Sequence, residues 1–183
     1  MRHGSGDVFR TGTLVGLLTL LVGCTCRPGM KAFDVRVEPR LASRPDQPAP
    51  DSVEVNLVGV TARDFARWSS YPVSQYWGPS DPLRREARSS GRAYVMVLSA
   101  DDPKPKELSR SDPIWAKWRA EGATQLLVLA FLPGARPGSG RGGGDPQRLI
   151  FPLDNCRWKD VDTLAVTVAP SGLSTRSVPQ PEK

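Results

Sequence analysis

The residue with the clearest chemical role is Cys24, which ends an apolar segment near the start of the chain. Arg2 and Arg10 give the segment a positive beginning, and the twelve residues Thr11–Val22 are mostly apolar. A helix of this length is too short to span a hydrocarbon core of about 30 Å. The pattern therefore predicts a cleaved signal peptide over residues 1–23, with a cysteine thiol as the first group of the mature chain.

The four residues Leu21–Cys24, Leu-Val-Gly-Cys, resemble the lipobox of bacterial lipoproteins. In that family the thiol carries a diacylglycerol, so the resemblance implies lipidation of Cys24 and a membrane partner reached through two or three acyl chains. Each buried methylene contributes about 0.8 kcal/mol, which makes such an anchor stable. In well-studied Gram-negative bacteria, an Asp directly after the lipidated Cys retains lipoproteins at the inner membrane. Thr25 stands there instead, which favours the outer membrane, on the periplasmic side.

The expected mature chain contains no histidine, because His3 is the only one in the sequence. A Ser-His-Asp or Cys-His catalytic set is therefore excluded, as is a zinc site that uses histidine. Carboxylate or lysine chemistry remains open, although the commonest general base at neutral pH is missing. Gly138–Gly143 matches G-x-G-x-x-G, but a strand pattern follows it where a dinucleotide site needs a helix. We predict a non-enzymatic protein without catalytic residues, cofactor or metal.

The other two cysteines, Cys26 and Cys156, leave two alternatives open. An oxidising periplasm permits a disulfide between them, which would pin the anchored N-terminus to the last hairpin. Against the bridge, Cys26 lies only two residues from the expected lipid, in a segment typical of a flexible tether. The second alternative is a free thiol at each site. Cys156 is not predicted to act as a nucleophile, because no histidine is present to activate it.

The charge of the mature chain is basic but dispersed. Residues 24–183 carry 23 basic and 18 acidic side chains, a net charge of +5, without a long basic block. The simplest interpretation is a solvated basic surface, and contact with anionic lipid or an acidic partner is the alternative. No nucleic-acid-binding motif is present, so a nucleic-acid partner is not predicted.

Four aromatic residues fall within ten positions and are the candidate partner-binding residues: Trp68, Tyr71, Tyr76 and Trp77. Flat rings on the rim of a sandwich can stack on sugars or anchor a protein partner. The alternative is that these rings pack in the core. Trp115 and Trp118 are predicted to be core residues, because they share the apolar stripe of a helix.

Apolar periodicity predicts a mainly β domain. Strands are expected over 33–38, 53–60, 71–77, 92–98, 123–132, 148–153 and 163–169. The clearest helix covers 112–121, where Asp112 suits the N-cap and Pro113 the first turn. Shorter helical turns are expected over 62–69 and after Asp81. Short connections favour an antiparallel β-sandwich of about seven strands with one short α-helix, and a small α+β domain is the alternative.

The predicted domain organisation has four parts. Residues 1–23 are the signal peptide, 24–32 a lipidated tether, 33–170 the β-sandwich, and 171–183 a disordered tail without periodicity.

The order of these elements resembles the small outer-membrane lipoprotein of type VI secretion systems. The segments FDVRVE, RPDQPAPDSVEVNLVGV, DFARW and TQLLVLAFLPG follow the same order as early strands, connector and long apolar strand of that family. The resemblance implies a transthyretin-like β-sandwich that grips the periplasmic part of an inner-membrane partner, through a loop corresponding to 40–51. The helix over 112–121 and the Gly-rich loop depart from the family pattern.

Two functional hypotheses follow. The first is a lipid-anchored module that binds a protein partner in the envelope, and the alternative is a lipid-anchored binder of carbohydrate or peptidoglycan. A hydrolase without histidine is a third and weaker interpretation. Exposure of the rings around Trp68–Trp77 in a row would favour the carbohydrate binder over the protein-binding module.

Overall fold

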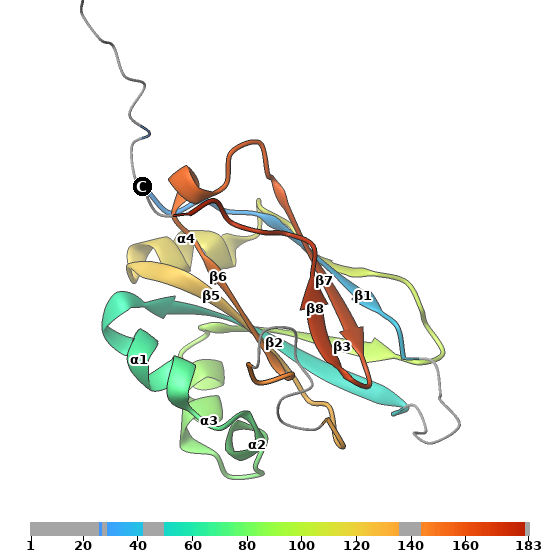
Figure 1. Cartoon of the computed structure of the whole chain (residues 1–183). Helices are drawn as coiled ribbons and strands as arrows, with labels where there is room; N and C mark the ends of the chain where they lie inside the picture. The colour runs from blue at the N-terminus through green and yellow to red at the C-terminus, as the bar shows by residue number, and fades with distance from the viewer. Residues whose placement is uncertain (1–25, 27–28, 42–49, 136–143, 182–183) are drawn as a thin grey trace, which may run out of the picture.

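Two four-stranded sheets packed face to face form the body of the molecule in the computed structural model (Figure 1). The structure describes residues 26, 29–41, 50–135 and 144–181. Cys24, the signal peptide over 1–23 and the Gly-rich loop Gly138–Gly143 lie outside the described residues. The prediction of a mainly β sandwich is confirmed.

The first sheet has the strand order β4-β1-β7-β8. Its strands are β1 (Asp34–Pro39), β4 (Lys106–Leu108), β7 (Thr163–Ala169) and β8 (Gly172–Thr175). β1 pairs with β7 in parallel, whereas β4 and β8 pair antiparallel with their neighbours. The parallel pair corrects the expectation of a purely antiparallel sandwich. It is possible because most of the chain separates β1 from β7, which leaves ample length for a crossover.

The second sheet is antiparallel throughout and has the order β3-β2-β5-β6. Its strands are β2 (Ser52–Thr61), β3 (Ala93–Ser99), β5 (Ala123–Ala130) and β6 (Arg148–Pro152). Alternate residues of both sheets meet in the core, and Val35, Val37, Val53 and Val55 are fully buried there. The alternation of strand side chains between two faces therefore placed the core correctly.

Both sheets run between the same two ends of the molecule. We call one end the anchor end, because it lies beside Cys26, close in the sequence to the expected lipidation site. There β1 and β7 begin together at Asp34 and Thr163, and Gln125 of β5 pairs with Pro152, the last residue of β6. The short 3-10 helix η1 (Asn155–Arg157) follows β6 at this end. At the far end, β1 finishes, β2 begins and β5 finishes. The strands thus separate the two ends by their full length (Figure 1).

Helices cover the outer face of the second sheet and close the anchor end. α1 (Ala62–Ser70), α2 (Val73–Tyr76) and α3 (Pro82–Ser89) lie against the second sheet, and α4 (Pro113–Ala120) precedes β5 (Figure 1). Side chains of Thr61, Asp81 and Asp112 accept the first free backbone N–H groups of α1, α3 and α4. The helix predicted over 112–121 is confirmed, with Asp112 as its N-cap.

A close approach between β2 and α4 explains a glycine within the strand. A Cβ atom added at Gly59 would lie 2.5 Å from Cγ of Trp118. The indole of Trp118 is fully buried and meets Trp115 edge-on, with ring centroids 4.9 Å apart. Gly59 therefore provides the space for the ring, and both tryptophans are core residues as predicted.

Three local predictions were wrong. The segment 71–77 contains helix α2, because the buried Val73 and Tyr76 share one helical face. Residues 106–108, where no strand was predicted, form β4, which pairs with β1 although it is only three residues long. The predicted disordered tail begins with β8, whose ladder to β7 and the bond from Leu173 N to Pro146 O give it order. Pairing, rather than local periodicity, produces β4 and β8.

Candidate functional site

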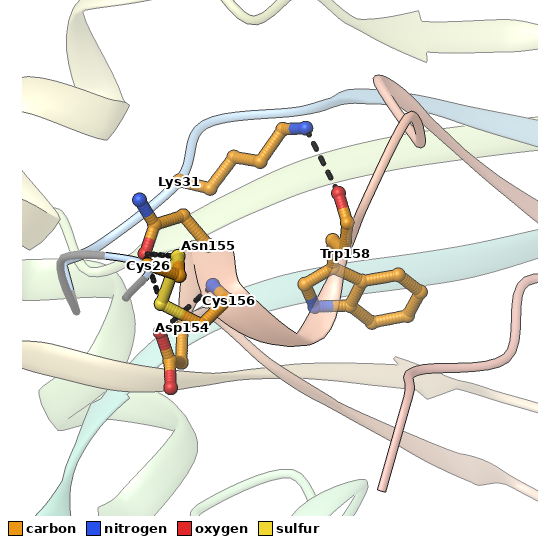
Figure 2. Close-up of a disulfide and its surroundings, with 6 residues drawn as sticks. All are labelled: Cys26, Lys31, Asp154, Asn155, Cys156 and Trp158. Carbon is orange, nitrogen blue, oxygen red and sulfur yellow. Dashed lines mark hydrogen bonds between the residues drawn. A yellow bond between two sulfur atoms is a disulfide. The ribbon is translucent and has the colours of Figure 1, made fainter. Parts of the chain in front are cut away.

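A disulfide joins Cys26 to Cys156 at the anchor end (Figure 2). The two Cα atoms lie 5.5 Å apart although 130 positions separate them in the sequence. Cys156 is presented by η1, whose first turn is capped by Asp154. The Asp154 carboxylate accepts the backbone N–H of Cys156 at 3.0 Å. The carboxylate cap therefore holds the turn that positions Cys156 for Cys26.

Backbone hydrogen bonds dock the segment after Cys26 against the same turn. The N–H of Asn155 donates to the carbonyl of Gly29 at 2.9 Å, and the N–H of Lys31 donates to the carbonyl of Leu153 at 2.8 Å. Met30 forms a β-bridge with Asp154. The last residues of the predicted tether over 24–32 are therefore held on the domain.

Lys31 reinforces this end through side-chain contacts. Its Nζ lies 3.0 Å from a carboxylate oxygen of Asp162. The same Nζ donates to the carbonyl of Trp158 at 3.3 Å (Figure 2). The hydrogen bond and the positive charge of Lys31 lower the pKa of Asp162, so this carboxylate stays ionised at neutral pH. The Trp158 ring is buried, and its Nε1 donates to the carbonyl of Pro152. The anchor end is thus a packed and cross-linked structure.

The four candidate aromatic residues do not form an exposed row. Trp68, Tyr76 and Trp77 are 5%, 1% and 8% exposed, and they pack with Val58, Leu127 and their neighbours beneath α1 to α3. Tyr71 is half-buried against the same cluster. Of the two alternatives for these rings, the structure therefore supports core packing, because these residues form a second core that fastens the helices to the sheet.

The two tyrosine hydroxyls of this cluster are structural. The amide Nδ2 of the buried Asn56 donates to the Tyr76 hydroxyl at 3.0 Å, and burial raises the pKa of Tyr76 to about 12. The Tyr71 hydroxyl donates to the Asp81 carboxylate, and this hydrogen bond raises the pKa of Tyr71. Both phenols therefore stay protonated at neutral pH and serve as hydrogen-bonding groups within the fold.

Above this second core, three large apolar side chains are exposed at the far end of the second sheet. Val95 and Val97 of β3 are 40% and 58% exposed, and Phe131, just after β5, is 42% exposed. We call these three residues the apolar rim. The Phe131 ring rests on the Trp77 ring, with centroids 5.6 Å apart. The candidate residue Trp77 therefore supports the rim from below.

A charged group borders the apolar rim. Glu54 forms ion pairs with Arg84, at 2.9 Å, and with Arg88. The Arg84 guanidinium lies over the Trp77 ring, 4.8 Å from its centroid, which is a cation–π contact. A shallow hollow of about 360 Å³ lies here, lined by Ser52, Glu54, Trp77, Arg84, Val97 and Phe131. The site joins exposed apolar surface to two arginines that share one glutamate.

The sequence analysis missed the apolar rim. The sequence predicted a strand over 92–98, and the structure buries only one of its faces. Tyr94, Met96 and Leu98 alternate with the outward Val95 and Val97, and this alternation was the available signal. Two adjacent outward valines on a strand would have indicated a partly covered face.

Neither a metal-binding cluster nor a helix able to cross a bilayer is found in the described part of the chain. In residues 26, 29–41, 50–135 and 144–181, no group of three or more His, Cys, Asp or Glu side chains is arranged to hold a metal ion. Among the same residues, no helix is long and apolar enough to cross a bilayer.

No protein-family model and no curated protein matches this sequence. Among solved structures, a chain of a type VI membrane complex is similar with a TM-score of 0.50 at 12% identity, over 81% of this chain and 99% of that chain. Lip of Serratia marcescens, a membrane-bound component of the type VI secretion system, gives 0.48 at 13%, over 81% and 97%. The type VI lipoprotein TssJ1 of Pseudomonas aeruginosa gives 0.46 at 12%, over 84% and 99%. The first likeness shows a shared β-sandwich fold.

Proposed function

We propose that this protein is a lipid-anchored, non-enzymatic lipoprotein of the bacterial envelope that binds a protein partner, and that it serves as the outer-membrane lipoprotein of a type VI secretion system. One coincidence carries the proposal. A sequence that resembles a lipobox ends at Cys24 and precedes a β-sandwich whose fold is similar to that of a chain from a type VI membrane complex. The fold alone is compatible with many functions. The expected lipobox adds a location in the cell envelope, which is the location that the proposed function requires.

We assign the protein partner to the apolar rim. β3 is an edge strand, and its sequence contains neither a charged residue nor Pro. Such residues commonly prevent an edge strand from pairing with a strand of another chain. Exposed apolar patches of this kind mark interaction sites, and an aromatic anchor such as Phe131 commonly carries much of the binding energy.

The charges beside the rim define the chemistry of the partner. Arg84 and Arg88 outnumber Glu54, so the site favours a segment that carries apolar side chains together with a carboxylate. A partner segment that carries carboxylates therefore fits this site better than a purely apolar one.

The carbohydrate-binding alternative has no comparable support. Stacking on a sugar needs the flat face of an aromatic ring to be open to solvent. Trp68, Tyr76 and Trp77 are buried, so the candidate residues do not provide such a platform.

The proposal is tested with the purified periplasmic domain of the inner-membrane type VI component from the same bacterium. The lipidated protein should capture this domain, and Val97→Asp should weaken capture at least tenfold, since a charge would enter the apolar contact. Val178→Asp is the matched control, because Val178 is 76% exposed but lies in the C-terminal segment. Both variants should melt close to the parent. Capture of purified peptidoglycan instead of the protein domain would contradict the proposal.

A further inference from the structure

The disulfide leaves a very short path between the expected lipid and the folded domain. Only Thr25 separates Cys24 from Cys26, and Cys26 is covalently joined to η1. Two residues of extended chain span at most about 7 Å. Gly29, five residues from Cys24, accepts a backbone hydrogen bond from Asn155, and an attachment at Gly29 alone would allow about 18 Å. The disulfide thus shortens the longest possible path between the lipid and the domain from about 18 Å to about 7 Å.

The apolar rim lies at the opposite end of the second sheet from this attachment. Ala123, the first residue of β5, lines the same surface hollow as Gly29 and Asp154, beside the disulfide. Phe131 follows the last residue of the same strand. Eight residues of β-strand extend about 25 Å. One strand therefore runs the whole way from the attachment point to the rim.

We infer that the Cys26–Cys156 disulfide orients the domain on the membrane, with the anchor end against the lipid surface and the apolar rim turned away from it. The inference rests on the lipidation of Cys24 in the proposed function, and it adds a direction to the anchor. A long tether would let the domain rotate freely relative to the membrane, so the apolar rim would face the lipid surface in some orientations and the periplasm in others. The short covalent link from Cys24 through Cys26 to η1 keeps the apolar rim on the aqueous side, where a protein that reaches across the periplasm can bind it.

The test compares the height of the two ends above a bilayer. A fluorescent dye is attached through a non-natural azide residue in place of Lys159, three residues beyond Cys156, or in place of Lys104. Lys104 follows Asp102, which bridges to Ser99 beside the rim hollow. The lipidated protein is reconstituted in phosphatidylethanolamine–phosphatidylglycerol vesicles that contain an acceptor dye on the headgroups. Energy transfer should be severalfold stronger from position 159 than from position 104.

The same short Gly-Ser segment is inserted at two positions. The comparison separates the effect of the path length between lipid and disulfide from any effect of the insertion on the fold. Insertion between Thr25 and Cys26 lengthens the path from lipid to domain and keeps the disulfide, so transfer from the two positions should become nearly equal. Insertion between Arg27 and Pro28 lies behind the disulfide and leaves the path short, so it should preserve the wild-type difference. Both insertions precede Phe33, the first buried hydrophobic residue in the described part of the chain, and a thermal melt verifies folding.

The outcomes distinguish the inference from the proposed function. Equal transfer from the two positions in the wild-type protein, or the same result for both insertions, overturns the inference while the protein still sediments with vesicles. If the wild-type protein does not sediment with vesicles and carries no lipid by mass spectrometry, the lipid attachment is wrong and the inference falls with it. Partner capture by the soluble domain is measured separately and is unaffected by either insertion.

Discussion

Replacement of Trp118 by Ala tests the contact that joins α4 to the core. The Trp118 indole is fully buried, and its Nε1 donates to the carbonyl of Arg92 at 2.8 Å. A buried tryptophan covers about 150–250 Å², which at about 25 cal/mol per Å² contributes about 4–6 kcal/mol. The lost hydrogen bond adds about 1 kcal/mol. Partial collapse of the cavity offsets some of this, so we expect Trp118→Ala to cost about 5 kcal/mol, the top of the usual range.

Gly59 makes this prediction specific to the observed geometry. Gly59→Ala places a methyl group 2.5 Å from Cγ of Trp118, so the ring must move, at a cost of about 1–3 kcal/mol. In a Trp118→Ala background the obstacle is gone, and the same methyl group enters a cavity. The two substitutions should therefore be non-additive by about 1–3 kcal/mol.

Urea unfolding of the soluble Cys24→Ser protein, followed by fluorescence and circular dichroism, gives the four free energies of the cycle. Lys117→Ala is the control on the same helix. Its side chain is 40% exposed and forms a surface ion pair with Glu121, so it should cost less than about 1 kcal/mol. Additive effects of Gly59→Ala and Trp118→Ala would refute the reasoning, as would equal stabilities of the Trp118→Ala and Lys117→Ala variants.

Three further predictions concern the cysteines and the second core. Cys26→Ser combined with Cys156→Ser should cost about 3–5 kcal/mol, because the bond closes a loop of 130 positions; a reducing agent should destabilise the wild-type protein equally and leave the double variant unchanged. Tyr76 has a pKa of about 12 in the folded state and 10.0 as its ordinary value, so the unfolded state loses its proton first and stability is lost as pH rises from about 10 to 12. Urea melts of Tyr76→Phe should lack this contribution, which reaches about 3 kcal/mol, and an unchanged pH profile would contradict the burial of the hydroxyl. Cys24→Ser should abolish incorporation of labelled palmitate and sedimentation with membranes; normal labelling of this variant would remove the basis for the anchor.

Local chemistry made part of this protein predictable from the sequence. The lipobox pattern at Leu21–Cys24 needs no tertiary structure, because a processing enzyme would act on an extended segment. Strand β2 followed from alternating valines, and α4 from Asp112 and Pro113, since both depend on neighbours within a few positions. Trp118 was assignable to the core because its spacing from other apolar residues defines one helical face.

Contacts between distant segments were decided only by the tertiary structure. Whether Cys26 and Cys156 pair depends on the docking of Gly29 against η1, which no spacing in the sequence encodes. Short strands such as Gly172–Thr175 carry too few residues for a periodic signal and form because a partner strand is already in place.

The aromatic segment shows the same division most clearly. Its composition indicated that Trp68 and Trp77 were important, but rings that pack in a core and rings that bind a ligand have the same sequence pattern. The covering helices buried them and left Val97 and Phe131 exposed in their place. The sequence by itself indicated the expected anchor, the longer strands such as β2 and the core-facing periodicity, all of which are local. The disulfide, the second core and the apolar rim were decided by how distant surfaces pack together, because burial is a property of the assembled fold and not of any segment.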